Sequence, residues 1–249
     1  MGDPATRGMA VGVETVLHTR VATLYSNLVT RPTGRAVRVA IQQQIQDCGG
    51  PCLSVLDFSH VGVIDFSCAD EVIAKLLRKY RRPDRPSEAF FLAHGVSEHH
   101  RDLIEAVLQR HNLLLVAVES GRPTLWGPAP ARLRAAWDCL NRLGCAFSAE
   151  FASARGVSPH AASSWLKRLA NWRVAVREAS GRFASLSAIL ERPPGYRREA
   201  VEMSPYGIAA ENRAPYGPEG EAADRVAAGA EDVTAFPPES EEIDQLPAW

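Results

Sequence analysis

Three short, largely apolar runs, separated by longer helical patterns, constrain the fold of this chain most strongly. The runs are Cys52–Phe58, Ala89–Ala93 and Leu113–Val118. Runs that do not alternate strictly with polar residues are typical of strands that a parallel sheet buries on both faces. Parallel strands need crossover connections, and the intervening helical patterns supply them. The sequence therefore predicts an α/β domain with at least three parallel strands over residues 1–120.

Amphipathic helices are expected before and between these strands. Their predicted ranges are Gly34–Cys48, Ser67–Arg81 and Glu98–His111. In the first of them Val37, Ile41 and Ile45 recur every four residues, which places an apolar stripe on one face. Val21–Thr30 is predicted to be one more strand or a hairpin arm.

A segment with two prolines and two glycines, Gly121–Ala129, follows, and we expect residues 121–130 to be a linker. Beyond it, residues 131–192 contain three helical patterns, a tight turn at Gly156–Val157 before the third, and a pair of strands. The third helix opens with Ser158-Pro159, a hydroxyl N-cap followed by proline at the first helical position. The other predicted ranges are Leu133–Leu143 and Ser148–Ala154 for helices, and Arg173–Glu178 and Arg182–Leu186 for strands. This order predicts an α+β winged helix-turn-helix domain.

Charge is distributed unevenly along the chain, although its formal net charge is −1. Residues 1–130 carry 14 Lys and Arg against 13 Asp and Glu, residues 131–199 carry 12 against 5, and residues 200–249 carry 2 against 11. The basic middle segment suits a polyanion such as DNA. The acidic end contains few large apolar side chains, and we expect residues 193–249 to be a disordered tail.

The outer face of the third helix offers small, hydroxyl and basic side chains to a DNA groove. Its predicted contact residues are Ser158, His160, Ser163, Ser164, Lys167 and Arg168, and flanking contacts are expected from Arg155, Arg173, Arg177 and Arg182. The first half of this face lacks Asn, Gln and Arg, the side chains that read base edges best. The predicted contacts are therefore mainly to the DNA backbone. A winged helix that only binds other proteins is the alternative.

A further pattern lies in the stretch CLSVLDFSHVGVIDFSCADEVIAKLLRKY. It contains Leu56-Asp57-Phe58-Ser59, Val61, Ile64-Asp65 and Ser67-Cys68-Ala69-Asp70-Glu71. This stretch resembles the STAS family, the domain of anti-sigma-factor antagonists, and is similar above all to a largely uncharacterised bacterial STAS-like family. In order of elements the resemblance extends over residues 15–120. It implies a loop serine that a partner kinase phosphorylates to switch partner binding; the matching residue is Ser67, with Asp57 and Asp65 at the family's acidic positions.

The sequence departs from the antagonist pattern at two positions of this loop. Phe66 stands where serine is usual, and Cys68 stands where glycine is usual. The bulkier Cys68 is expected to crowd an approaching kinase. A structural role for Ser67 stays open beside phosphorylation, because Ser67-x-x-Asp70 has the form of a helix-capping arrangement. The predicted switch loop comprises Asp57, Asp65, Ser67, Cys68 and Asp70.

The sequence predicts no metal site, no cofactor and no catalytic residue. Its five cysteines have irregular spacing, which favours free thiols in a reducing compartment over a disulfide framework. Cys48-x3-Cys52 lacks the Cys-x2-Cys spacing of a strong zinc site. No run approaches the roughly 18 apolar residues of a membrane-spanning helix, and the N-terminus does not have the pattern of a secretory signal. We therefore expect a cytoplasmic location.

These patterns predict a bacterial regulatory protein, not an enzyme. A STAS-like domain for partner binding or a phosphorylation switch would be coupled to a winged-helix DNA-binding domain. The expected partners are DNA and a kinase or anti-sigma-type protein, no membrane is expected to take part, and a homodimer stays open. The alternative is a protein-interaction adaptor of the anti-sigma, partner-switching type that binds no DNA.

Overall fold

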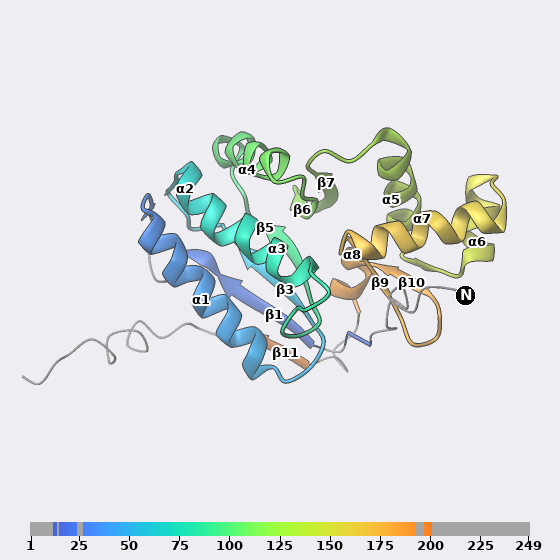
Figure 1. The fold of residues 1–249 in the computed structure, drawn as a ribbon, viewed down its shortest axis with the longest axis horizontal. Helices are drawn as coiled ribbons and strands as arrows, with labels where there is room; N and C mark the ends of the chain where they lie inside the picture. The colour runs from blue at the N-terminus through green and yellow to red at the C-terminus, as the bar shows by residue number, and fades with distance from the viewer. Residues whose placement is uncertain (1–11, 14, 24–26, 193–196, 201–249) are drawn as a thin grey trace, which may run out of the picture. The chain divides into compact units, whose positions relative to one another are not determined.

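The computed structural model describes residues 12–13, 15–23, 27–192 and 197–200. They contain a six-stranded sheet in the order β11-β1-β3-β5-β6-β7 (Figure 1). Its strands are β1 (Thr15–Arg20), β3 (Cys52–Asp57), β5 (Ala89–His94), β6 (Leu115–Glu119), β7 (Arg122–Trp126) and β11 (Arg197–Ala200). Neighbours pair in parallel except β6 and β7, which are antiparallel. The predicted α/β class with a mainly parallel sheet is confirmed.

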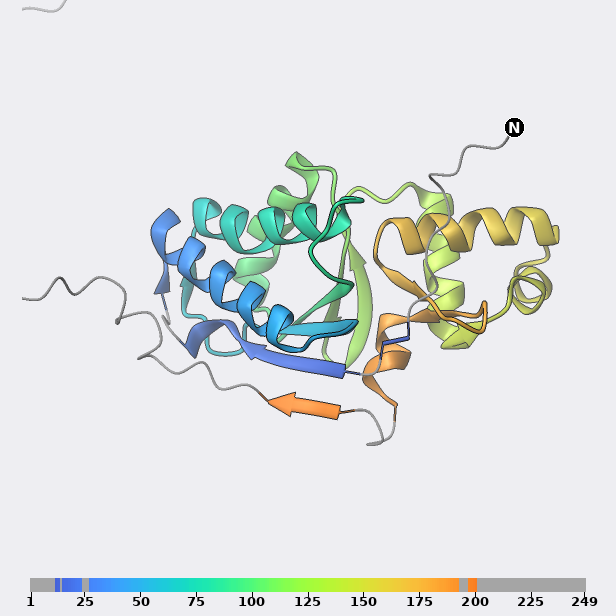
Figure 2. The same ribbon diagram turned by 60° about the horizontal axis from the view of Figure 1, so that its bottom comes forward.

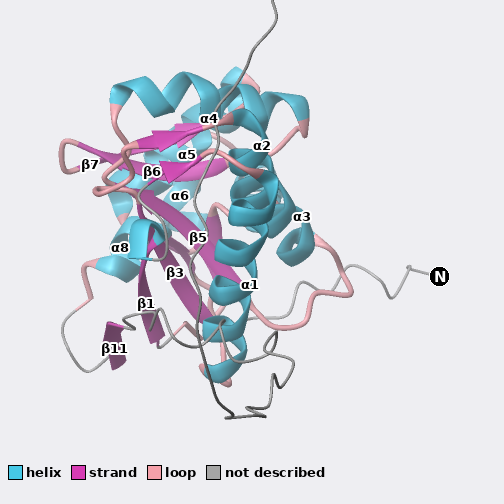
Figure 3. Cartoon of the chain, turned by 90° about the vertical axis from the view of Figure 1, so that its left-hand side faces the viewer, coloured by secondary structure: helices cyan, strands magenta, loops and turns pink. Residues whose placement is uncertain are grey.

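Helices cover one face of this sheet (Figure 3). They are α1 (Arg31–Asp47), the continuous helix formed by α2 (Phe66–Ala69), the π-helical η3 (Asp70–Ala74) and α3 (Lys75–Arg81), and α4 (Glu98–Arg110). The apolar stripe predicted for the first helix is confirmed, because Val37, Ile41 and Ile45 are all buried. They belong to one hydrophobic cluster with Leu56 of β3 and Phe91 of β5.

The opposite face of the same sheet packs against residues 131–192. In β3 the side chains alternate: Cys52 and Leu56 belong to the cluster under the helices, whereas Leu53 and Val55 belong to a second cluster. That second cluster also contains Trp137 from the later part of the chain. Burial on both faces explains why the strand sequences are apolar in nearly every position. Both parts lie within a single compact unit.

Residues 131–192 form four helices and a small antiparallel sheet of order β8-β10-β9. The elements are α5 (Ala131–Leu143), β8 (Cys145–Ala146), α6 (Ser148–Arg155), α7 (Pro159–Asn171), β9 (Ala175–Arg177), β10 (Phe183–Ser185) and α8 (Leu186–Leu190). Gly156, with a φ of 64°, ends α6 in the left-handed conformation. The Ser158 hydroxyl then accepts the Ala161 N–H at 3.2 Å, which confirms the predicted N-cap. Strand β8 was not predicted from the sequence.

The linker predicted for residues 121–130 is wrong over Arg122–Trp126, which form β7 and pair with β6. Leu125 and Trp126 are buried on opposite faces of the sheet, so the segment contributes to both clusters. Gly127 follows with a φ of 98°, and a Cβ there would lie only 2.2 Å from the Leu113 carbonyl oxygen. The prolines and glycines of this segment shape a hairpin and its exit, and do not make a linker.

The predicted start of the tail at residue 193 is also wrong. Arg197–Ala200 form β11, which pairs in parallel with β1 at the edge of the sheet. In Figure 2 the orange β11 lies beside the blue β1. An open edge strand offers backbone hydrogen bonds to any extended segment, whatever its side chains, so composition does not reveal such pairing. Residues 193–196 and 201–249 of the expected tail lie outside the described residues.

The strand predicted over Val21–Thr30 is displaced. Strand β1 ends at Arg20, and Val21–Thr23 form a 3₁₀ turn. Among the other described residues of that range, 27–30, β2 (Asn27–Leu28) is the strand, and it pairs with β4 (Val63–Ile64). In the described part of the chain, no helix is both long enough and apolar enough to span a membrane.

Candidate functional site

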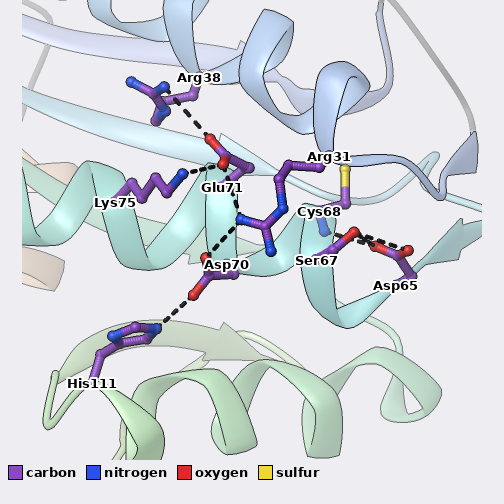
Figure 4. Close-up of polar contacts among 9 residues, drawn as sticks. All are labelled: Arg31, Arg38, Asp65, Ser67, Cys68, Asp70, Glu71, Lys75 and His111. Atoms are coloured by element: carbon purple, nitrogen blue, oxygen red, sulfur yellow. Dashed lines mark hydrogen bonds and ion pairs between the residues drawn. The ribbon is translucent and has the colours of Figure 1, made fainter.

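Asp65, not Ser67, caps the helix that carries the predicted switch loop (Figure 4). Asp65 has extended backbone and precedes Phe66, the first residue of α2. Its carboxylate accepts the Cys68 N–H at 2.6 Å and the Ser67 hydroxyl at 2.9 Å. The cap predicted for Ser67-x-x-Asp70 is therefore wrong, because the carboxylate two residues earlier satisfies the first turn. The half-buried Ser67 hydroxyl lies inside that turn and donates to its cap.

Cys68 does not face the surface of the loop. Its side chain is fully buried, and a Cβ added to Gly34 of α1 would lie 2.8 Å from its sulfur. Burial, together with the negative charges of Asp65 and Glu71, raises the pKa of the Cys68 thiol to about 11. The thiol is thus a neutral packing group where α1 and α2 approach closely. The predicted crowding of a kinase by Cys68 is wrong, since the helical turn directs this side chain inward.

A buried carboxylate further along the same helix gathers three cations. Glu71 is only 2% exposed, and it accepts from Arg31 at 3.2 Å, from Arg38 at 3.5 Å and from Lys75. Burial raises the pKa of Glu71, but the contacts with Lys75 and the two arginines lower it more, so the pKa lies below its ordinary value. Glu71 is therefore ionised at neutral pH and ties α1 to the helix that follows the switch loop.

Asp70 extends this network toward α4. The Nε2 of His111, which follows α4, lies 2.5 Å from Asp70 Oδ1, and Arg31 Nη1 lies 3.4 Å from Asp70 Oδ2. Asp70 and Glu71 open the π-helical turn, a rare conformation that is frequent at functional sites. The sequence prediction missed the cationic partners. Arg31, Arg38 and His111 lie far from Asp70 and Glu71 in the sequence. The two adjacent acids are therefore the one local feature that indicates a cationic environment.

Asp57 lies apart from this network, at the carboxyl end of β3. Its Oδ1 accepts the Ser59 N–H at 2.9 Å and the Ser59 hydroxyl at 2.5 Å, and His94 Nδ1 lies 3.6 Å away. Partial burial raises the pKa of Asp57, but Ser59 and His94 lower it more, so the pKa lies below its ordinary value. Within the described ranges, no hydrogen bond or ion pair joins Asp57 to Asp65 or Ser67. The structure therefore groups Asp65, Ser67 and Cys68, places Asp70 beside them on the same helix, and leaves Asp57 outside.

The predicted DNA-contacting residues of α7 lie mainly on its outer side. The inner side is buried through Ala162, Leu166 and Leu169, which pack in the second hydrophobic cluster. The exposed predicted residues are Ser158, His160, Ser164, Lys167 and Arg168, whereas Ser163 is half-buried. The helix therefore presents hydroxyl and imidazole groups first and two cations toward its end.

Three flanking arginines contact aromatic rings within the same part of the chain. The distances from guanidinium carbon to ring centre are 5.5 Å for Arg155 and Trp165, 6.0 Å for Arg177 and Phe183, and 5.4 Å for Arg182 and Phe147. Arg182 also donates to the Cys145 sulfur at 2.9 Å. All three side chains are half-buried, so they are less available to DNA than their number in the sequence suggests.

The DNA contact predicted for Arg173 is wrong. Its side chain is 13% exposed and donates to the Glu88 carboxylate at 2.6 Å and to the Ala89 carbonyl oxygen at 2.8 Å. The guanidinium also lies 4.0 Å from the centre of the Phe90 ring. Arg173 has a φ of 63°, so the chain reverses there, and β9 begins only at Ala175. Arg173 joins residues 131–192 to the sheet and does not face solvent.

Among the residues that the structure describes, no group of three or more His, Cys, Asp or Glu side chains is arranged to hold a metal ion.

No protein-family model matches this chain, and no curated protein matches it.

Proposed function

We propose that this chain is a cytoplasmic bacterial regulatory protein that binds DNA through a winged helix over residues 131–192 and a partner protein through a STAS-like domain, which comprises the six-stranded sheet and the helices on one of its faces. It would act by binding, not by catalysis. The order α5-β8-α6-α7-β9-β10 supports the winged-helix assignment, with β9 and β10 as the wing. The parallel sheet with helices on one face supports the α/β partner domain.

The outer side of α7 is the observation that carries the DNA proposal. His160, Ser164 and Lys167 are exposed at the spacing of neighbours along one helix face, and Arg168 is exposed beside them. Short polar side chains let a helix backbone approach a groove, and cations at one end suit the phosphates that border it. The Gly156 turn and the Ser158 cap fix where this helix begins.

Backbone contact is the mode of binding that this surface supports best. Lys167 and Arg168 are exposed, whereas the Arg173 side chain is 13% exposed and is paired with Glu88. Few cations remain for the phosphates, so we expect moderate affinity that falls with salt, with a modest slope set by the small number of phosphate contacts.

The test is a salt titration of binding to random-sequence duplex DNA, measured on the full chain by fluorescence anisotropy. Replacing both Lys167 and Arg168 with Ala removes two phosphate contacts and is expected to reduce the slope of log K against log salt by about 2. A matched control replaces Arg132 and Arg142, two exposed arginines of α5, with Ala. The control removes the same charge but is expected to keep most of the slope.

No binding at low salt would rule out the DNA proposal and leave the protein-interaction adaptor. Equal losses in the two double variants would mean that α7 is not the contact surface.

The partner-binding half of the proposal rests on the turn that contains Asp65 and Ser67. A phosphate on Ser67 would replace a hydroxyl donor with a dianion beside the Asp65 carboxylate, which opposes the cap. We therefore expect Ser67→Glu to accelerate amide hydrogen exchange in the first turn of α2, whereas Ser67→Ala leaves it nearly unchanged. Equal exchange in the two variants would remove the physical basis for a switch at this position.

A further inference from the structure

Two cysteines meet at one end of α1. Cys48 is the C-cap residue of α1, Cys52 is the first residue of β3, and the turn Gly49-Gly50-Pro51 joins them. Gly49 has a φ of 68°, the left-handed conformation that favours glycine, so the chain reverses directly after the helix. The Cys48 side chain is close enough to contribute to the raised pKa of the Cys52 thiol. Both side chains also pack in the hydrophobic cluster between α1 and the sheet.

The two thiols differ in access to solvent. Cys48 is half-buried, whereas Cys52 is fully buried. A small oxidant in solution therefore meets Cys48 first. Burial, with the adjacent Cys48 thiol, raises the pKa of Cys52 to about 12. Cys52 thus stays protonated and unreactive on its own, and it is placed to react only with its oxidised neighbour.

We propose that Cys48 and Cys52 form a redox-active thiol pair that hydrogen peroxide converts into an intramolecular disulfide. In the first step the Cys48 thiolate attacks one peroxide oxygen: an S–O bond forms, the O–O bond breaks, and the released hydroxide takes up a proton to become water. In the second step the Cys52 sulfur gives up its proton and attacks the Cys48 sulfenic sulfur. The S–S bond forms, the S–O bond breaks, and a second water leaves. Two thiols are oxidised and one peroxide is reduced to two waters.

The pair lies next to the contact that joins residues 131–192 to the sheet. The Cys52 N–H donates to the Glu88 carbonyl oxygen at 2.9 Å, and the Glu88 carboxylate accepts from Arg173. A disulfide would fix the end of α1 to the start of β3 beside this contact. The thiol chemistry does not depend on DNA binding, so it can be tested independently of the proposed function.

Mass spectrometry of the unaltered full chain tests the proposal. The protein is treated with hydrogen peroxide, denatured, alkylated with N-ethylmaleimide and cleaved on the N-terminal side of Asp. Cleavage before Asp47 and Asp57 releases residues 47–56, which contain Cys48 and Cys52 as their only cysteines. We expect this peptide to lose both alkylation sites and the mass of two hydrogen atoms, and to regain both sites after reduction.

Two variants separate the steps. In Cys52→Ser the sulfenic acid on Cys48 cannot be resolved, so dimedone should trap it; in Cys48→Ser the buried Cys52 should stay fully alkylatable. Cys145, also half-buried but in contact with Arg182, serves as the control thiol in the same sample. The proposal is overturned if residues 47–56 keep both alkylation sites after peroxide treatment, or if Cys48 is recovered only as a disulfide between two chains.

Discussion

Arg173→Ala should destabilise the contact between residues 131–192 and the sheet. We expect it to reduce the free energy of unfolding more than replacement of an exposed residue does. The guanidinium is held by Glu88 at 2.6 Å and by the Ala89 carbonyl oxygen at 2.8 Å. Both members of the ion pair are well buried, with side-chain exposures of 13% and 16%. Burial raises the pKa of Glu88, but Arg85 and Arg173 lower it more, so Glu88 is ionised at neutral pH.

The size of the effect follows from these contacts. Removing one partner of a buried, hydrogen-bonded ion pair costs about 3–5 kcal/mol, because the other charge stays behind in the interior. Arg85 still contacts Glu88 in the variant, which favours the lower end of that range. We expect Arg173→Ala to reduce the free energy of unfolding by about 3 kcal/mol.

The backbone at this position supplies an internal check. Arg173 has a φ of 63°, a conformation that costs a residue with a Cβ about 1–2 kcal/mol and costs glycine almost nothing. Arg173→Gly loses the same contacts as Arg173→Ala but relieves this strain. The Gly variant is therefore expected to be about 1 kcal/mol more stable than the Ala variant.

Urea unfolding followed by tryptophan fluorescence measures these differences. The matched control is Arg168→Ala, which removes an exposed arginine of α7 and should stay within about 0.5 kcal/mol of the parent protein. A loss below about 1 kcal/mol in Arg173→Ala would refute the stabilising role of the pair. A Gly variant less stable than the Ala variant would refute the left-handed conformation.

Three further measurements address the switch loop and the sheet. Asp65→Ala should lose about 1 kcal/mol of stability because it removes the cap, whereas Ser67→Ala should lose less than half as much; the reverse order in urea unfolding would restore Ser67 as the cap. Gly127→Ala should lose about 2–4 kcal/mol, since its Cβ would overlap a backbone carbonyl oxygen, but Gly121→Ala, which meets open space, only about 1 kcal/mol. Glu71→Gln should be less stable than the parent near neutral pH. The folded pKa of Glu71 lies below 4.5, so the parent's advantage is complete above that value and shrinks as the pH falls through the folded pKa. A difference that stays constant down to about pH 3 would contradict the ion-pair network.

Local patterns in the sequence predicted much of the fold. The central strands were predicted because burial on both faces requires apolar residues in nearly every position. The start of α7 was predicted because Gly156 and Ser158 suit the turn and the cap chemically, whatever surrounds them. The spacing of Leu166 and Leu169 predicted which side of α7 is buried, and hence the candidate DNA-binding side.

Tertiary structure decided how polar groups are paired. Asp65 and Ser67 are both suitable capping residues. In the structure α2 begins directly after Asp65, so the Asp65 carboxylate caps the helix. Nothing in the local sequence distinguishes Arg173 from an exposed arginine, because its partner Glu88 lies far away in the sequence. Competition between nearby capping groups depends on the path of the backbone, and ion pairs depend on which distant elements pack together. Neither is encoded in a local pattern, so only the folded chain distinguishes the cations that hold the protein together from those that face a ligand.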